Sequence, residues 1–433
     1  MGNSIWTESA SLPQFKSLQE NIHTDVLIIG GGMCGILCAY YMRKAGISYA
    51  LAEARQIGQG ITKNTTAKIT SQHGLIYQKL VTGYGLENAK KYLDANQIAL
   101  YRFKELAKTI DCDLEEKDSY VYTTKDYEKI QREVSIMESL GFPAKFVSNP
   151  QIPLTTEGSV QFPGQAQFHP LKFLATISKD LNIYENTMIN EIKQLTAYSD
   201  FGSITAKQII VATHFPFLNK HGSFFIKMYQ ERSYVIALNK AMSVDGMYVD
   251  EAKGGFSFRT YKDLLLLGGG GHKTGHTGGK WDVLREYAGL TFPYAVEKYY
   301  WATQDCMSLD SIPYIGKYSN NTPGIYVASG FNKWGMTTSM VAAMILTDMV
   351  LGRKNDWEDV FLPQRSILKP QLLVNAGESI VNLLTPTTKR CSHLGCAVKW
   401  NNSEHTWDCP CHGSRFEKDG TLIDNPAKKN AKL

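Results

Sequence analysis

Residues 25–35 read Asp25-Val26-Leu27-Ile28-Ile29-Gly30-Gly31-Gly32-Met33-Cys34-Gly35, a short apolar run followed by a glycine-rich turn. The β-branched run is typical of a buried parallel strand, and residues 33–44 have the composition of a helix that ends at Gly46. A second strand is expected at 48–52, with Glu53 at its end. Strand, glycine turn, helix, strand and acid follow one another as in a Rossmann-like dinucleotide-binding unit.

The spacing of the glycines explains how such a unit binds its ligand. A G-x-G-x-x-G turn lets the backbone approach a pyrophosphate, whose charge the following helix N-terminus stabilises. An acid at the end of the second strand accepts a hydrogen bond from a ribose hydroxyl. NAD(P) could use the same fingerprint, but the chain has no second G-x-G-x-x-G for a separate nicotinamide domain. The expected dinucleotide-binding residues here are Gly30, Gly32, Gly35, Glu53 and Ala54.

Length and charge bound the class of protein. At 433 residues and 43% hydrophobic, the chain is long enough for two or three domains with cores of their own. A formal net charge of +5 is too small and too dispersed to indicate a nucleic-acid partner. The start at residues 1–6 lacks the features of a secretory signal, and the apolar run at 26–42 is too short to span a bilayer. We therefore expect a cytoplasmic protein with no transmembrane segment.

Two boxes near the C-terminus carry a second kind of chemistry. Residues 391–396 read Cys-Ser-His-Leu-Gly-Cys, and residues 409–414 read Cys-Pro-Cys-His-Gly-Ser. Reduced to ligands this is C-x-H, fifteen residues, and C-x2-H, with an extra Cys in each half. Two Cys and two His suit a [2Fe–2S] cluster in which one iron takes thiolates and the other takes imidazoles. A four-ligand zinc site built from the same residues is the alternative.

The boxes closely resemble those of Rieske proteins of the respiratory type. Ser414 can donate a hydrogen bond to a cluster sulfur, whereas Phe416 stands where high-potential members have Tyr, which implies a lower potential here. The module is also short, so we expect its cluster loops to rest on the rest of the protein. The resemblance implies Cys391 and Cys409 as ligands of the inner iron, His393 and His412 as ligands of the outer iron, and a disulfide between Cys396 and Cys411.

Three further blocks resemble the D-amino-acid-oxidase superfamily of FAD-dependent oxidoreductases. Residues 58–70 are small and hydroxyl-rich, like the stretch that passes under the flavin in that superfamily. Residues 207–214 and 324–337 look like its returning strand and its last strand and helix, whose N-terminus faces the flavin pyrimidine. The resemblance implies FAD contacts from Thr62, Thr65, Thr66, Lys68, Ala212, Thr213, Gly330, Trp334, Gly335, Met336 and Thr337.

The resemblance to both families predicts an α/β fold, α+β overall. A Rossmann-like FAD-binding domain would be interleaved with a sheet-containing substrate domain and followed by a small all-β Rieske module. The glycine run at 268–275 is expected to be a turn at a domain boundary. The expected divisions are 22–75, 145–215 and 293–352 for the FAD-binding domain, 76–144 and 216–292 for the substrate domain, 353–388 for a partly helical linker, and 389–433 for the module.

Substrate residues are less clearly marked. Amino-acid oxidases hold a carboxylate with an Arg and often a Tyr, because a planar guanidinium grips it bidentately. Arg259, Tyr248 and His214 are the candidates for catalytic residues, and Arg232 and Tyr234 also lie on expected strands of the substrate domain.

Three functions are compatible with these features. In the first, FAD oxidises a C–N bond of a small-molecule amine or amino acid, and the [2Fe–2S] cluster passes the electrons to an external acceptor. In the second, the cluster feeds electrons to the flavin, which reduces or hydroxylates a substrate. In the third, the protein is a redox-sensing flavoprotein without turnover.

Overall fold

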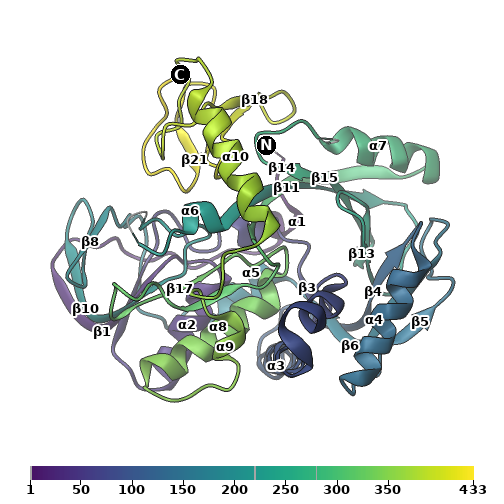
Figure 1. The fold of residues 1–433 in the computed structure, drawn as a ribbon, viewed down its shortest axis with the longest axis horizontal. Helices are drawn as coiled ribbons and strands as arrows, with labels where there is room; N and C mark the ends of the chain where they lie inside the picture. Colours follow the sequence, from purple (N-terminus) through teal and green to yellow (C-terminus); the bar gives the residue numbers. More distant parts are fainter. Residues whose placement is uncertain (1, 219–220, 279) are drawn as a thin grey trace.

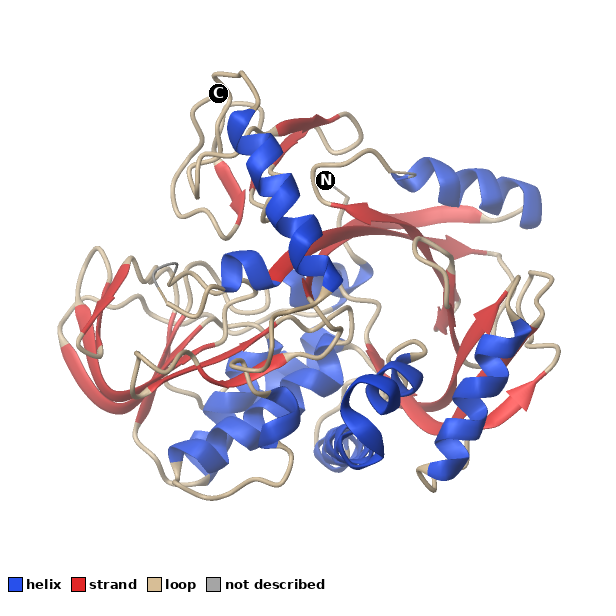
Figure 2. Cartoon of the chain, in the orientation of Figure 1, coloured by secondary structure: helices blue, strands red, loops and turns tan. Residues whose placement is uncertain are grey.

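The computed structural model describes residues 2–218, 221–278 and 280–433, which form two large sheets with covering helices and a small C-terminal sheet (Figure 1, Figure 2). The architecture is mixed α/β with an all-β terminal module, as the sequence predicted. Among the described residues, no helix combines the length and apolar character that crossing a bilayer requires.

The first sheet is built around the strand that precedes the glycine turn. This strand pairs in parallel with both of its neighbours, and the residues at 26–29 are buried. A parallel strand covered on both faces favours such a continuous apolar run. Its strand order is β16 (Tyr314–Lys317), β17 (Ile325–Ser329), β10 (Ser203–Val211), β1 (Ile22–Ile29), β2 (Tyr49–Ala52) and β7 (Ile183–Tyr184), while β9 (Thr196–Tyr198) joins β10 to β8 (Glu191–Lys193).

The second sheet collects strands from distant parts of the chain. It includes residues 145–147, 158–167 and 296–308, which lie within the ranges expected for the FAD-binding domain. These segments pair with strands far away in sequence, and local composition does not encode such pairing. Its strand order is β15 (Val296–Ser308), β11 (Met228–Asn239), β14 (Leu264–Lys273), β13 (Ser257–Tyr261), β12 (Met247–Asp250), β4 (Glu115–Thr123), β6 (Gly158–Gln167) and β3 (Lys68–Ile69), with β5 (Lys145–Val147) paired to β6.

The prediction of a turn at 268–275 is wrong for most of this range, because β14 continues through Gly271 to Lys273. The glycines are needed for close approach to the neighbouring strand β13 and to the start of α7. A Cβ on Gly268 would lie 2.6 Å from the Ser257 hydroxyl, and one on Gly270 would lie 2.6 Å from a backbone oxygen of Lys280. Glycine inside a strand often marks such an approach.

The two faces of the second sheet contribute to different cores. Ile236 and Phe258 pack on the outer face beneath α7 (Lys280–Thr291). Val235 and Tyr261 belong to the large core shared with the first sheet. The inner face of β11 and β13 is therefore the face turned toward the predicted FAD site.

Helices cover the first sheet, and α7 lies on the outer face of the second (Figure 1). α2 (Met33–Lys44) packs against α8 (Gly335–Val350), and both contribute to the large core. α10 (Pro370–Leu384) lies across the front of the molecule and leads up to the C-terminal module (Figure 1). The remaining helices are α1 (Ile5–Ser9), the 3-10 helix η1 (Ile61–Asn64), α3 (Ile76–Ala107), α4 (Tyr127–Ser139), α5 (Pro170–Ile177), α6 (Phe224–Lys227) and α9 (Glu358–Phe361).

The C-terminal module, drawn in yellow in Figure 1, is a small antiparallel sheet with its own core. Four cysteines of the two boxes lie in this core together with Phe416. The strands, in spatial order, are β18 (Lys399–Asn401), β19 (Thr406–Asp408), β20 (Arg415–Phe416) and β21 (Leu422–Asp424).

Candidate functional site

The glycine turn between β1 and α2 is closely packed. Gly30 has a φ of +112°, and a Cβ there would lie 2.9 Å from the Ala212 carbonyl oxygen. A Cβ on Gly35 would lie 1.8 Å from the Gly30 oxygen. Both positions therefore require glycine, and the turn brings α2 against the end of β1 as a pyrophosphate site needs.

Glu53 and Thr62 hold the turn from either side. Glu53 accepts hydrogen bonds from the Gly31 N–H at 2.6 Å and the Arg55 N–H at 2.9 Å, and its burial raises the pKa of the carboxyl. The Thr62 hydroxyl accepts from the Met33 N–H at 3.1 Å, at the N-terminus of α2. Both predicted residues thus lie at the glycine turn, where donors for an anion are concentrated.

The hydroxyl-rich segment after the second strand forms a fixed loop. Its backbone oxygens at Thr65 and Asn64 accept from the indoles of Trp6, at 2.7 Å, and Trp301, at 2.9 Å. The Lys68 ammonium donates to the Thr66 hydroxyl at 3.1 Å. Burial, with a smaller contribution from Arg259, lowers the pKa of Lys68 to about 7.

The N-terminus of α8 meets a histidine that sequence reasoning missed. His73 stacks on Trp334 with ring centroids 5.1 Å apart, and its Nε2 lies 3.0 Å from the Thr337 hydroxyl. Burial lowers the pKa of His73 to about 3, so the ring is neutral near pH 7. Its position three residues after the hydroxyl-rich segment at 58–70 is the signal that could have identified it.

The three candidate catalytic residues do not converge. Arg259 points from β13 to the inner face, where Nη1 donates to the Thr66 and Ala67 carbonyls at 2.5 and 2.8 Å. Tyr248 is the cross-strand neighbour of Phe258 on the outer face, 4.6 Å from the Tyr120 ring. Cross-strand partners share a face and successive residues alternate, so Tyr248 and Arg259 lie on opposite sides of the sheet. His214 lies elsewhere, 3.1 Å from the Gln230 side-chain oxygen.

Arg259 keeps unused donors. It is 1% exposed, and its Nε and Nη2 have no hydrogen-bond partner among the described residues. Burial lowers the pKa of its guanidinium to about 9. Unpaired donors on a buried cation favour an anionic ligand at this position.

The two other arginine and tyrosine candidates are engaged by the C-terminal module. The Arg232 guanidinium forms a bidentate ion pair with Glu404, and the Tyr234 hydroxyl donates to the same carboxylate at 3.2 Å. Arg415 also pairs with Glu404, at 2.8 Å. Burial opposes ionisation, but the two guanidinium groups outweigh it and lower the pKa of Glu404 to about 2.

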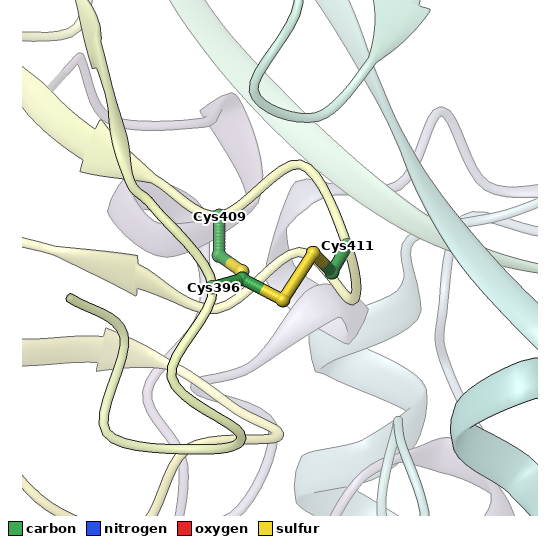
Figure 3. A group of neighbouring side chains, drawn as sticks. All are labelled: Cys396, Cys409 and Cys411. Atoms are coloured by element: carbon green, nitrogen blue, oxygen red, sulfur yellow. A yellow bond between two sulfur atoms is a disulfide. The ribbon is translucent and has the colours of Figure 1, made fainter. Parts of the chain in front are cut away.

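The predicted cluster ligands come together at one end of the module. A disulfide joins Cys396 and Cys411, the pairing that the resemblance implied, and so removes both from the available ligands. Figure 3 shows Cys409 beside this disulfide, and the three sulfur atoms lie within 4.8 Å of one another. Cys391 and Cys409 are buried free thiols.

The two histidine candidates, one in each cluster loop, lie next to each other. The rings of His393 and His412 have centroids 4.9 Å apart. His412 is 2% exposed, and neither of its ring nitrogens makes a hydrogen bond to a described residue. A buried imidazole with two unused nitrogens fits metal ligation, as two thiols and two imidazoles fit a [2Fe–2S] cluster of the Rieske type.

Matching turns shape the two cluster loops. The Gly395 N–H donates to the Cys391 oxygen at 3.0 Å, and the Gly413 N–H donates to the Cys409 oxygen at 2.9 Å. Both glycines have a left-handed φ, of +81° and +80°. The Ser414 hydroxyl accepts from the Ala427 N–H at 3.0 Å, which anchors the second loop.

The histidine side of the module is docked on the rest of the protein. The Gln230 amide donates to the His412 oxygen at 2.7 Å, and the Gln304 amide donates to the Gly413 oxygen at 2.8 Å. The Phe215 ring contacts the rings of both histidines, at 6.4 and 6.3 Å between centroids. The cluster loops thus rest on the flavoprotein body, as the short module led us to expect.

Together, the glycine turn and the docked Cys–His loops define an oxidoreductase with a dinucleotide site and an iron–sulfur centre. Comparison with protein families supports both parts: residues 25–349 match the model described as FAD dependent oxidoreductase, and residues 364–433 match the Rieske [2Fe-2S] domain. The chain belongs to the FAD dependent oxidoreductase family and carries a C-terminal Rieske domain. The first part binds FAD, and the second binds a [2Fe–2S] cluster.

Known proteins share this organisation or part of it. The Rieske 2Fe-2S iron-sulfur protein YhfW of Bacillus subtilis is 36% identical over 99% of this chain and 97% of its own length. The fold is similar to that of glycine oxidase from Geobacillus kaustophilus, at a TM-score of 0.67 and 18% identity over 79% of this chain and 99% of that one. L-proline dehydrogenase from P. horikoshii gives a TM-score of 0.67 at 18% identity, over 80% of this chain and 98% of that one.

Proposed function

We propose that the protein is a dehydrogenase that oxidises a C–N bond of an amine or amino acid and delivers the electrons through its Rieske domain to an external acceptor. When bound, FAD takes up two electrons as a hydride, whereas a Rieske cluster exchanges electrons one at a time. A chain that holds both suits a reaction whose final oxidant accepts single electrons.

The observation that carries this proposal is the contact between the cluster loops and the segment that follows β10. Ala212, the first residue after β10, packs against Gly30 of the glycine turn. Three residues later, Phe215 contacts the rings of His393 and His412. A short stretch of one chain therefore links the FAD site to the histidine side of the module, which favours electron exchange within the molecule.

Arg259 supports an amino acid as the substrate. Its buried guanidinium lies on the inner face of the second sheet with Nε and Nη2 unpaired among the described residues. Two parallel N–H groups match the two oxygens of a carboxylate. We assign Arg259 to the substrate carboxylate, and we expect Arg259→Lys to weaken amino-acid binding about ten- to a hundredfold while leaving simple amines unaffected.

An anaerobic reduction experiment tests the function. Oxidised holoprotein is mixed with a panel of amino acids and the corresponding amines, while flavin absorbance and the cluster EPR signal are followed. We expect a substrate that bleaches the flavin to reduce the cluster as well. A bleached flavin beside a cluster that stays oxidised would contradict the proposal.

The same experiment with a reduced donor distinguishes the opposite direction. If reduced ferredoxin or NAD(P)H reduces the cluster and then the flavin, and no amine or amino acid reduces either, electrons flow from the cluster to the flavin. Reduction by neither kind of partner would favour a redox sensor.

A further inference from the structure

The polarity of helix α10 is inverted relative to an ordinary surface helix. Its buried side is polar: Asn375 and Asn382 are 5% and 4% exposed, and Glu378 faces inward, where it pairs with Lys273 and His276. Its outer side is apolar, with Leu373 and Leu384 each 77% exposed. Surface helices normally turn the apolar side to the core.

The exposed apolar residues form one continuous stripe. Leu373, Ile380 and Leu384 follow the spacing of a single helix face, on which Gly377 lies between the first two. No described residue covers this face, and contiguous exposed apolar patches mark interaction sites. The outer stripe consists of Leu373, Val374, Ile380, Val381 and Leu384, with Leu368 and Leu383 beside it.

Basic residues lie at both ends of the stripe. Lys369 directly precedes the helix, with its ammonium over the Tyr84 ring, and Lys389 follows it, with its ammonium over the Trp407 ring. Glu378 is the one acid of α10, and it is turned inward. The Arg390 N–H donates to the Lys432 oxygen at 2.9 Å, so the lysine-rich C-terminal segment meets the same end of the helix. An apolar stripe between basic ends is complementary to an anionic lipid surface.

We propose that α10 is an interfacial helix that binds the protein to an anionic membrane, with its apolar stripe among the lipid headgroups and upper acyl chains. Fifteen residues span only about 22 Å as a helix, too short to cross a bilayer but sufficient to lie in its plane.

The helix is joined directly to the first cluster loop. The Ala397 N–H donates to the Asn382 oxygen at 2.9 Å. The Arg390 guanidinium donates to the oxygens of Leu383, at 3.0 Å, and Gly395, at 3.1 Å. Membrane binding through α10 therefore holds the Rieske domain at the lipid surface. If the function proposed above holds, the external acceptor is membrane-borne, whereas lipid binding itself does not depend on that function.

Vesicle flotation with the holoprotein tests the proposal. We expect the protein to float with vesicles of equal parts phosphatidylcholine and phosphatidylglycerol, to float little with phosphatidylcholine alone, and to be released by salt. The double variant Leu373→Gln/Leu384→Gln should reduce the bound fraction about tenfold or more, and Lys369→Gln should reduce it several-fold. Leu290→Gln, at an equally exposed leucine on α7, is the matched control and should bind as the wild type does.

Absorbance and activity measurements separate a loss of membrane binding from a loss of folding or function. Flavin and cluster absorbance, and substrate reduction with a water-soluble artificial acceptor, should be the same in every variant, so that loss of flotation is separated from loss of folding or function. No flotation by the wild type, or flotation that the double variant retains, would overturn the proposal. A wild-type dimer that the double variant dissociates, without vesicle binding, would assign the stripe to a second copy of the chain instead.

Discussion

At the scale of single residues, the neighbourhood of the cluster is set by a few side chains of the module core. Phe416 is fully buried on β20, opposite Trp407 on β19, and shares its core with the four cysteines of the boxes. It brings no hydroxyl to this position, where the resemblance to high-potential Rieske proteins implies a tyrosine that donates a hydrogen bond to the cluster.

We expect Phe416→Tyr to raise the midpoint potential of the cluster. One added hydrogen bond contributes about 1 kcal/mol, which corresponds to on the order of 40 mV for a one-electron couple. Protein-film voltammetry measures the change, and Trp407→Phe, on the neighbouring strand, serves as a control for altered packing. A midpoint that stays the same or falls in Phe416→Tyr would show that the hydroxyl does not reach the cluster.

A second residue-scale prediction concerns the ion pair between Arg232 and Glu404. Both side chains are almost fully buried, so removing the Arg232 cation leaves Glu404 with one paired guanidinium, that of Arg415, among the described residues. We expect Arg232→Met to destabilise the docked module by about 3 kcal/mol, seen as a lower urea midpoint for loss of the cluster absorbance.

The control is Arg285→Met, which removes a partly exposed bidentate pair with Glu297 and should cost about 0–1 kcal/mol. Because the pKa of Glu404 is lowered to about 2, the contribution of the ion pair is present above pH 4.5 and is lost as the pH falls from there through 2. Equal effects of the two substitutions would contradict this account.

At the scale of elements, α4 caps the start of α3. The Leu75 position before α3 supplies no side-chain cap, and instead Glu133 of α4 accepts from the Tyr77 and Gln78 N–H groups, each at 2.9 Å. The contact that holds the two helices together therefore also caps α3. It satisfies backbone N–H groups that the start of a helix leaves without a partner.

This arrangement predicts a pH dependence. Burial raises the pKa of Glu133 to about 7, so the folded protein binds the proton more tightly than the unfolded chain does. Its contribution to stability is therefore largest below pH 4.5 and is lost as the pH rises from there through 7. We expect Glu133→Gln to flatten the dependence of the free energy of unfolding on pH by about 1–3 kcal/mol over this range. Glu138→Gln, exposed on the same helix, should leave the dependence unchanged.

At the scale of the whole molecule, two glycines of the module differ in how close they lie to the flavoprotein body. Gly395 and Gly413 occupy matching turns of the two cluster loops, with φ of +81° and +80°. A Cβ on Gly413 would lie 2.6 Å from the Gln230 side chain, whereas one on Gly395 meets no atom within 4 Å.

Alanine at either position strains its loop, but only Gly413→Ala should displace the module. We expect Gly413→Ala to raise hydrogen exchange in β11 around Gln230 and to slow electron exchange between flavin and cluster at least tenfold relative to Gly395→Ala. Similar exchange and similar rates in the two variants would show that the module is not held by this contact.

The sequence predicted those parts of the protein whose functional residues lie close together along the chain. The glycine turn at 30–35 and the cluster boxes at 391–396 and 409–414 each specify their geometry within a few residues, because backbone approach and ligand distance are set by neighbours in the chain. The strands and helix around the turn follow from the same local patterns.

The sequence could not predict which distant segments meet. β6 and β15 join the second sheet, and Tyr248 and Arg259 fall on opposite faces of it, because strand pairing is decided by packing across the chain. Arg232, a reasonable carboxylate ligand by composition, is paired with a glutamate 172 residues away.

By itself, therefore, the sequence determined that this chain carries two redox centres, since the binding residues of each lie in compact runs of the sequence. Only the tertiary structure decided how the centres face each other, through Phe215, Gln230 and Gln304, and that α10 turns its apolar side outward. Docking and exposure depend on the free energy of contacts between distant segments, which no local pattern records.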